Sequence, residues 1–281
     1  MQRRARPSWT VSSVDGVEVA AHELGGDGPP LLVAHATGFL GTVYGPLAAG
    51  LHDRFRVVAL DFRGHGWSNR PDNGDFGWDR LTLDLLAVAE RLGEPPIHGF
   101  GHSLGGGTLL LAEHERPGTF DSLVLFEPIV FPDEFDFDGP NPMSAPARMR
   151  RPTFPSRAEA LARYASRPPL NEMRPDVLEI YVRDGFVDQP DGSVRLACAP
   201  DDEAATFDGS ATVRLSRIGD VTSAVTVLVG AEHEDAPSPA RHGPAIVAGL
   251  PNARLQAHPE VGHLAPFEQP DAVAAMVLES V

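Results

Sequence analysis

The sequence predicts an α/β protein with a mostly parallel, doubly wound sheet of about eight strands, flanked by helices and carrying an inserted helical lid. Three features support this prediction: short apolar runs alternate with segments of helical spacing, a hairpin-like segment precedes them, and one long stretch interrupts the alternation. The 281 residues are 42% hydrophobic and 22% charged, which is typical of a globular chain with a large core. This length suits one α/β core with an insertion.

The alternation begins after an antiparallel segment. Two stretches of alternating polarity, 9–14 and 17–24, flank Asp15-Gly16, which is typical of a tight hairpin turn. Short apolar runs then predict buried parallel strands, and polar and apolar residues at helical spacing fill the segments between them. The expected strands are 31–34, 57–60, 97–100, 123–126, 225–229 and 253–258, and the expected helices are 78–92, 104–115, 240–250 and 265–280.

Residues 131–220 break this alternation. Proline, aspartate and arginine are dense there, and apolar strands disappear. We interpret this inserted segment as a lid, so that residues 1–130 and 221–281 form the core. Helical patterning inside it covers 157–165 and 176–186, and Asp191-Gly192 indicates a turn.

The charge balance and residue usage exclude several classes of function. Acidic residues outnumber basic ones 39 to 23, and the net charge of −16 disfavours nucleic acids and anionic membranes as partners. The chain has no lysine, which excludes a Schiff base, a Ser-Lys dyad and a P-loop. Its single cysteine, Cys198, cannot form an internal disulfide. No apolar run has the length of a signal peptide or a membrane span, so we expect a cytoplasmic protein without membrane insertion. Nothing in the sequence indicates a cofactor or an oligomeric state.

A candidate nucleophile lies between a predicted strand and a predicted helix. Gly101-His102-Ser103-Leu104-Gly105 has the pattern and the context of a G-x-S-x-G nucleophile elbow. The glycines let the backbone pass close to its neighbours, so that a strained turn presents the Ser103 hydroxyl at a helix N-terminus. An isolated serine here would more simply cap the helix, but the strand and helix around it favour a nucleophile.

A serine hydroxyl needs a base to take its proton. Among eleven histidines, His263 is the best candidate because Val261-Gly262-His263-Leu264 falls between the last strand and the last helix. Loops at that carboxyl edge of an open α/β sheet carry functional residues, and Ser103 lies at the same edge. No histidine spacing is typical of a metal site, and we expect none.

Together these motifs resemble the α/β-hydrolase fold family over essentially the whole chain, from Val11 to Ser280. The resemblance implies that His35-Ala36-Thr37-Gly38-Phe39 is the loop after the third strand, although Ala36 stands where glycine is usual. The backbone N–H groups of Thr37 and Leu104 would then bind the oxyanion of a tetrahedral intermediate. The segment Asp61-Phe62-Arg63-Gly64-His65-Gly66-Trp67-Ser68 resembles the family's D-x-R-G-x-G-x-S segment, which we interpret as bracing a loop.

The resemblance leaves the third member of a triad open. The family's acid usually follows the strand at 225–229, but His233 stands at the expected position. Glu127 in Leu125-Phe126-Glu127-Pro128 resembles an alternative arrangement seen in one branch of the haloalkane dehalogenases, and we favour it. Because a shift of the loop by one residue would bring other acids into range, Glu232, Glu234 and Asp235 stay as alternatives. Ser103 stands where dehalogenases and epoxide hydrolases carry an aspartate, so their chemistry is not expected here.

The main functional hypothesis is a serine hydrolase that cleaves a carboxylic ester, thioester or lactone of a small, largely apolar substrate through an acyl-enzyme on Ser103. Carbon–carbon bond hydrolysis of a diketone and a non-catalytic small-molecule receptor on the same fold are the alternatives. The candidate substrate-binding residues are Phe39, His102, Phe131 and Phe135. A local arginine such as Arg148 or Arg183 would offset the protein's negative field at the site.

Overall fold

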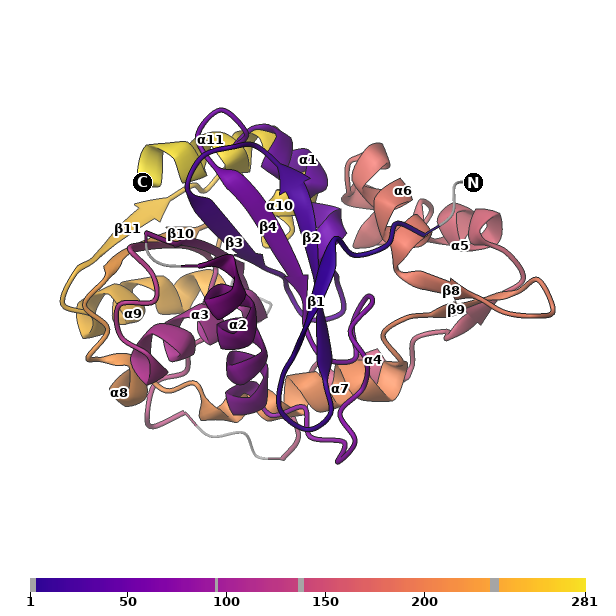
Figure 1. The fold of residues 1–281 in the computed structure, drawn as a ribbon, viewed down its shortest axis with the longest axis horizontal. Coiled ribbons are helices and arrows are strands. Elements are labelled where there is room, and N and C mark those ends of the chain that lie inside the picture. The colour runs from indigo at the N-terminus through magenta and orange to yellow at the C-terminus, as the bar shows by residue number, and fades with distance from the viewer. Residues whose placement is uncertain (1–3, 94–95, 136–138, 233–237) are drawn as a thin grey trace.

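A single eight-stranded sheet forms the centre of the computed structural model, which describes residues 4–93, 96–135, 139–232 and 238–281 (Figure 1). The strand order is β1-β2-β4-β3-β5-β6-β10-β11, antiparallel at β1–β2 and β2–β4 and parallel elsewhere. This confirms the predicted fold class. The strands are β1 Trp9–Ser12, β2 Glu18–Gly25, β3 Pro30–Ala34, β4 Arg56–Asp61, β5 His98–His102, β6 Ser122–Phe126, β10 Ala224–Val229 and β11 Ala253–Ala257.

Helices cover both faces of this sheet. Figure 1 shows α2, α3 and α9 on one face and α1 and α11 on the other, and each set packs on its own cluster of buried side chains. The core helices are η1 Gly41–Tyr44, α1 Gly45–Ala49, α2 Trp78–Leu92, α3 Leu104–Glu115, η4 Pro239–His242, α9 Gly243–Gly249, α10 Ala265–Glu268 and α11 Pro270–Ser280. The single C-terminal helix expected at 265–280 is two helices, because Pro270 has no N–H with which to continue the first one.

The inserted segment, residues 131–220, lies between β6 and β10. Its helices are α4 Ser144–Arg148, α5 Arg157–Tyr164, η2 Leu170–Glu172, α6 Pro175–Asp184, α7 Pro200–Asp208, η3 Gly209–Thr212 and α8 Leu215–Ile218. The backbone of Phe131 pairs with that of Val213 and Leu215, which ties the start of the segment to its end. The division into a core of residues 1–130 and 221–281 and a lid of residues 131–220 stays a prediction.

The inserted segment also carries strands that the sequence analysis did not expect. The strands β7 Thr153–Phe154, β8 Phe186–Asp188 and β9 Val194–Leu196 form a small antiparallel sheet in the order β7-β9-β8. Strands this short give no readable apolar run. The expected turn at Asp191-Gly192 joins β8 to β9, with Gly192 at a φ of 87°.

Hydrogen bonds and ion pairs attach the inserted segment to the core at several places. The indole N–H of Trp78, on α2, donates to the carbonyl of Thr206 at 2.7 Å. The N-terminal end of the described chain lies beside α6 in Figure 1, where the backbone N–H of Ala5 donates to Asp184 at 2.9 Å. These contacts anchor two separate helices of the inserted segment, α6 and α7, to the core.

Candidate active site

Ser103 lies in a strained turn between β5 and α3. Its φ is 56° and its ψ is −112°, a backbone conformation rare for a residue with a side chain. The Ser103 N–H donates to the carbonyl of Phe126 at 3.0 Å, and the Ser103 carbonyl accepts from Ile129 at 3.1 Å. A Cβ added at Gly105 would lie 1.9 Å from the carbonyl oxygen of Ala34. The turn is therefore held by backbone contacts that only glycine at position 105 allows.

His263 and Glu127 meet beside this turn. Nδ1 of His263 is 2.5 Å from Oε2 of Glu127, and Oε1 of Glu127 accepts from the backbone N–H of Gly230 at 2.9 Å. The Glu127 side chain is 1% exposed, whereas that of His263 is 34% exposed. Because a carboxylate can only accept, this contact holds the proton on Nδ1 of a neutral His263 and leaves Nε2 as the basic nitrogen.

The other candidate acids are Glu232, Glu234 and Asp235. Glu232 is 58% exposed and forms an ion pair with Arg241 at 3.4 Å. Glu234 and Asp235 fall outside the described residues. Of the two candidate carboxylates that the structure describes, Glu127 contacts His263 and Glu232 does not.

The predicted oxyanion loop follows β3 and lies against the N-terminus of α3. Within the described part of the chain, no group accepts a hydrogen bond from the backbone N–H of Thr37 or of Leu104. The loop itself is fixed, since the N–H of Gly38 donates to Nε2 of His65 at 3.2 Å and Gly38 takes a φ of 79°. Ala36 fits where glycine is usual because the left-handed conformation falls on Gly38 instead.

His102 connects the oxyanion loop to the His263 loop. The N–H of Ala36 donates to the hydroxyl of Tyr44 at 3.1 Å, that hydroxyl lies 2.9 Å from Nδ1 of His102, and Nε2 of His102 lies 2.9 Å from the carbonyl of His263. A carbonyl accepts, so Nε2 carries the proton, and Tyr44 must donate to Nδ1 of a neutral ring. Burial and the nearby His263 both hold the pKa of His102 well below its usual value, which agrees with this assignment.

This geometry corrects the expectation that His102 contacts the substrate, because its side chain is fully buried and both ring nitrogens bond to protein groups. Phe39 is less buried than His102. It follows the oxyanion loop, is half-buried, and its ring lies 4.3 Å from that of Phe267 on α10. Phe131 and Phe135 stack on each other at 4.9 Å at the start of the inserted segment, where the Arg214 guanidinium lies 5.9 Å from the Phe131 ring.

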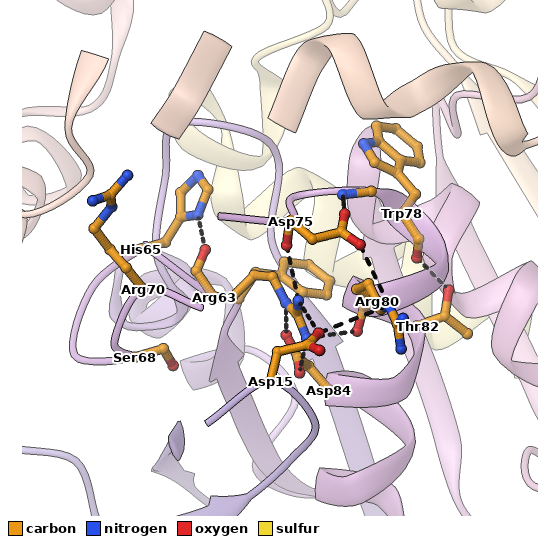
Figure 2. Close-up of polar contacts among 12 residues, drawn as sticks. Asp15, Arg63, His65, Ser68, Arg70, Asp75, Trp78, Arg80, Thr82 and Asp84 are labelled. Atoms are coloured by element: carbon orange, nitrogen blue, oxygen red, sulfur yellow. Dashed lines mark hydrogen bonds and ion pairs between the residues drawn. The ribbon is translucent and has the colours of Figure 1, made fainter. Parts of the chain in front are cut away.

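The Asp61–Ser68 segment is a brace, as the sequence analysis interpreted it (Figure 2). The Arg63 guanidinium is buried and binds both oxygens of Asp84 at 2.7 and 2.9 Å, and it also contacts Asp15 at 3.0 Å. The Ser68 hydroxyl donates to the carbonyl of Asp61 at 2.6 Å. These contacts tie the loop after β4 to α2 and to the first hairpin.

Residues that the sequence analysis missed lie on the far side of the oxyanion loop. Nη2 of Arg150 is 2.6 Å from the hydroxyl of Tyr181, which in turn donates to the carbonyl of Gly38 at 3.3 Å, and Arg150 also pairs with Glu203. No local motif marks these positions. The arginines named from the sequence are neutralised instead: Arg148 pairs with Asp208 at 3.0 Å, and Arg183 pairs with Asp184 at 2.6 Å.

The described residues offer neither a metal-binding cluster nor a membrane-spanning helix. They hold no group of three or more His, Cys, Asp or Glu side chains arranged to bind a metal ion. None of their helices combines the length and apolar character needed to span a bilayer.

The model of a known family, described as "Alpha/beta hydrolase family", matches residues 31–276. The chain belongs to the alpha/beta hydrolase family. This match confirms the resemblance drawn from the elbow, the histidine loop and the oxyanion loop.

Individual relatives within the alpha/beta hydrolase family are distant. The 2-(acetamidomethylene)succinate hydrolase of Mesorhizobium japonicum is 27% identical over 206 residues, which cover 73% of this chain and 71% of that protein. The magnesium-chelatase 30 kDa subunit of Rhodobacter capsulatus is 34% identical over 91 residues, so the chain matches about a third of its length. Among solved structures, the thioesterase domain from the curacin biosynthetic pathway has a TM-score of 0.79 and 18% identity, covering 99% of this chain and all of that one. At that identity the likeness shows the fold alone.

Proposed function

We propose that this protein is a serine hydrolase that cleaves a carboxylic ester, thioester or lactone of a small molecule, with residues 131–220 as its lid. One observation carries the proposal: His263 bonds through Nδ1 to the buried Glu127 carboxylate at 2.5 Å, beside a serine held in a strained turn. A neutral imidazole oriented by a carboxylate has the arrangement that activates a serine hydroxyl.

In the first half-reaction, Ser103 Oγ attacks the substrate carbonyl and His263 Nε2 takes the hydroxyl proton. The negative charge that develops on the carbonyl oxygen is met by the free N–H groups of Thr37 and Leu104. Glu127 stabilises the imidazolium that forms. When the tetrahedral intermediate collapses, the bond to the leaving group breaks and His263 returns the proton to that group, leaving an ester on Ser103.

In the second half-reaction, water replaces the leaving group. His263 Nε2 takes a proton from water, the resulting hydroxide attacks the acyl-enzyme, and the same pair of N–H groups binds the oxyanion. Collapse then releases the acid, and Ser103 recovers its proton from His263. The relative named as a 2-(acetamidomethylene)succinate hydrolase supports a hydrolytic reaction on this fold.

The test is covalent labelling with a fluorophosphonate probe, followed by intact-protein mass spectrometry. We expect the native protein to gain one adduct and Ser103→Ala to gain none. His263→Ala and Glu127→Gln should label at least about a hundredfold more slowly, because the base or its orientation is lost. Glu232→Gln is the matched control, since this carboxylate pairs with Arg241, and it should label at the native rate. A folded native protein that stays unlabelled would instead support a small-molecule receptor.

A further inference from the structure

The inserted segment contains a cavity of about 240 Å³ whose walls are rich in arginine. It lies between the α4–β7 connection, α5 and the loop after α5. Arg150, Arg151, Arg163 and Arg167 all line it, and its other walls include the rings of Phe154 and Tyr164. No acidic side chain is among the lining groups in the described chain. The cavity is therefore a positively charged recess in a protein of net charge −16.

Most of these arginines have no acidic partner. Arg150 pairs with Glu203, but no carboxylate in the described part of the chain lies within ion-pair distance of Arg151, Arg163 or Arg167. The Nε of Arg151 donates to the carbonyl of Thr153 at 2.8 Å. Arg151, Arg163 and Arg167 therefore bring positive charge to one recess without a nearby carboxylate to balance it. A bound anion would supply that counter-charge.

Hydrogen bonds connect one wall of the cavity to the oxyanion loop. On one side, Arg150 contacts Tyr181, and Tyr181 reaches the carbonyl of Gly38, the residue after Thr37. On the other side, the wall ends at Leu170, which begins η2. The chain that follows is fixed to α10 by the N–H of Arg174, which donates to the carbonyl of Phe267 at 3.0 Å. Since α10 directly follows the His263 loop, hydrogen bonds connect the segments around the cavity to both the oxyanion loop and the histidine loop.

We propose that this cavity binds a carboxylate carried by the acyl part of the substrate, so that the enzyme prefers half-esters and half-thioesters of small dicarboxylic acids, and lactones that carry a carboxylate. This inference rests on the proposed function of Ser103. The planar guanidinium fork matches a carboxylate in two-point geometry. The overall negative field opposes a dianion such as phosphate more than a monoanion, which favours the carboxylate. The substrate is then charged at one end, in place of the largely apolar substrate expected from the sequence.

The first test compares two p-nitrophenyl esters that differ in one charge: p-nitrophenyl hydrogen glutarate, and its neutral methyl ester. We expect the native enzyme to favour the carboxylate ester at least about tenfold in kcat/KM, which is the range of one charge-assisted hydrogen bond. The double variant Arg163→Gln/Arg167→Gln should reduce this ratio about tenfold, mainly through KM of the charged ester. Arg195→Gln is the control, because Arg195 is an exposed arginine of the same segment that lies outside the cavity, and it should keep the native ratio.

The second test measures binding without turnover, by calorimetry on folded Ser103→Ala. Glutarate should bind more tightly than inorganic phosphate, and Arg163→Gln/Arg167→Gln should weaken glutarate about tenfold. The proposal is overturned if the native enzyme hydrolyses both esters equally well, if the double variant leaves the ratio unchanged, or if phosphate binds the better of the two anions. If neither ester is hydrolysed and the fluorophosphonate probe does not label Ser103, the proposed function fails, while glutarate binding still tests the cavity by itself.

Discussion

The core and the inserted segment hold their functional residues in different ways. In the core, the strained Ser103, the Glu127 carboxylate and the oxyanion loop are fixed by backbone hydrogen bonds and by close approaches such as that of Gly105 to Ala34. The inserted segment also carries ion pairs with a solvent-exposed member, such as Arg148–Asp208 and Arg157–Asp188. Backbone geometry cannot change without unfolding the sheet, whereas exposed charges can be replaced at little cost.

This difference suggests a division of labour. The core would supply the reaction, and the charged side chains of the inserted segment would select the substrate. Substitutions in the core should therefore change kcat or folding strongly, and substitutions among surface charges of the inserted segment should change little beyond the affinity for one class of substrate.

The largest difference between the two regions is expected when one carboxylate in each is replaced by its amide. Glu127→Gln should lower kcat by about 10⁴, because an amide donor opposite Nδ1 favours the wrong tautomer of His263. Asp188→Asn, in the inserted segment, removes an exposed partner of Arg157 and should change kcat less than about twofold. Steady-state kinetics on an ester substrate measures both, and comparable losses in the two variants would contradict the division of labour.

Two glycines test the same contrast in stability. Gly105→Ala places a methyl group 1.9 Å from a backbone carbonyl, and should destabilise the protein by about 3 kcal/mol or prevent folding. At Gly192, in the β8–β9 turn, a Cβ meets nothing within 4 Å, so Gly192→Ala should cost about 1 kcal/mol for its positive φ alone. Urea unfolding followed by circular dichroism compares them, and equal costs would show that the elbow is less tightly packed than the structure indicates.

The stability change between pH 7 and pH 5 should come mainly from the core, since histidine titrates in this range and the inserted segment contains no histidine. Burial and the neighbouring His65 lower the pKa of His35 to about 3. Below about pH 6.5, His35 binds a proton in the unfolded chain but not in the folded protein. The free energy of unfolding therefore falls as the pH drops. For His35 alone, the change from pH 7 to pH 5 should cost about 2 kcal/mol.

The other buried histidines modify this pH dependence. Burial also lowers the pKa values of His65 and His102, which adds to the loss. Burial acts to lower the pKa of His22 as well, but the Asp61 carboxylate outweighs it and raises that pKa, so His22 contributes stability at low pH and offsets part of the loss. Unfolding free energies measured in urea at both pH values check the net sign, and a protein more stable at pH 5 would show that His35 is protonated when folded.

The smallest effects are expected from the Tyr44 hydroxyl, which links the oxyanion loop to His102, and from a matched surface ion pair. Tyr44→Phe leaves the N–H of Ala36 and Nδ1 of His102 without their partner, which should cost about 1–2 kcal/mol of stability and about tenfold in kcat/KM. Arg148→Gln, which breaks an exposed ion pair of the inserted segment, should cost less than about 1 kcal/mol and leave the kinetics unchanged. Thermal melts and ester kinetics on both variants measure this. If Tyr44→Phe kept native kcat/KM, the link would not position the oxyanion loop.

Much of the fold was predictable because its signals are local. The bounds expected for α2 and α3 agree with the structure, since apolar spacing and the flanking glycines mark them within a few residues of sequence. The strands β7, β8 and β9 were missed because two or three residues carry no periodicity, and the split between α10 and α11 was missed although Pro270 signalled it.

The sequence by itself determined the fold class and the placement of Ser103 in a strand-to-helix turn, because both follow from patterns in adjacent residues. Only the tertiary structure placed the Glu127 carboxylate against His263, since the two residues lie 136 positions apart. It also decided that His102 is buried, that Arg148 and Arg183 are neutralised, and that other arginines gather around a cavity. Burial and pairing depend on the distance between side chains that are remote in sequence, and no local pattern encodes that distance.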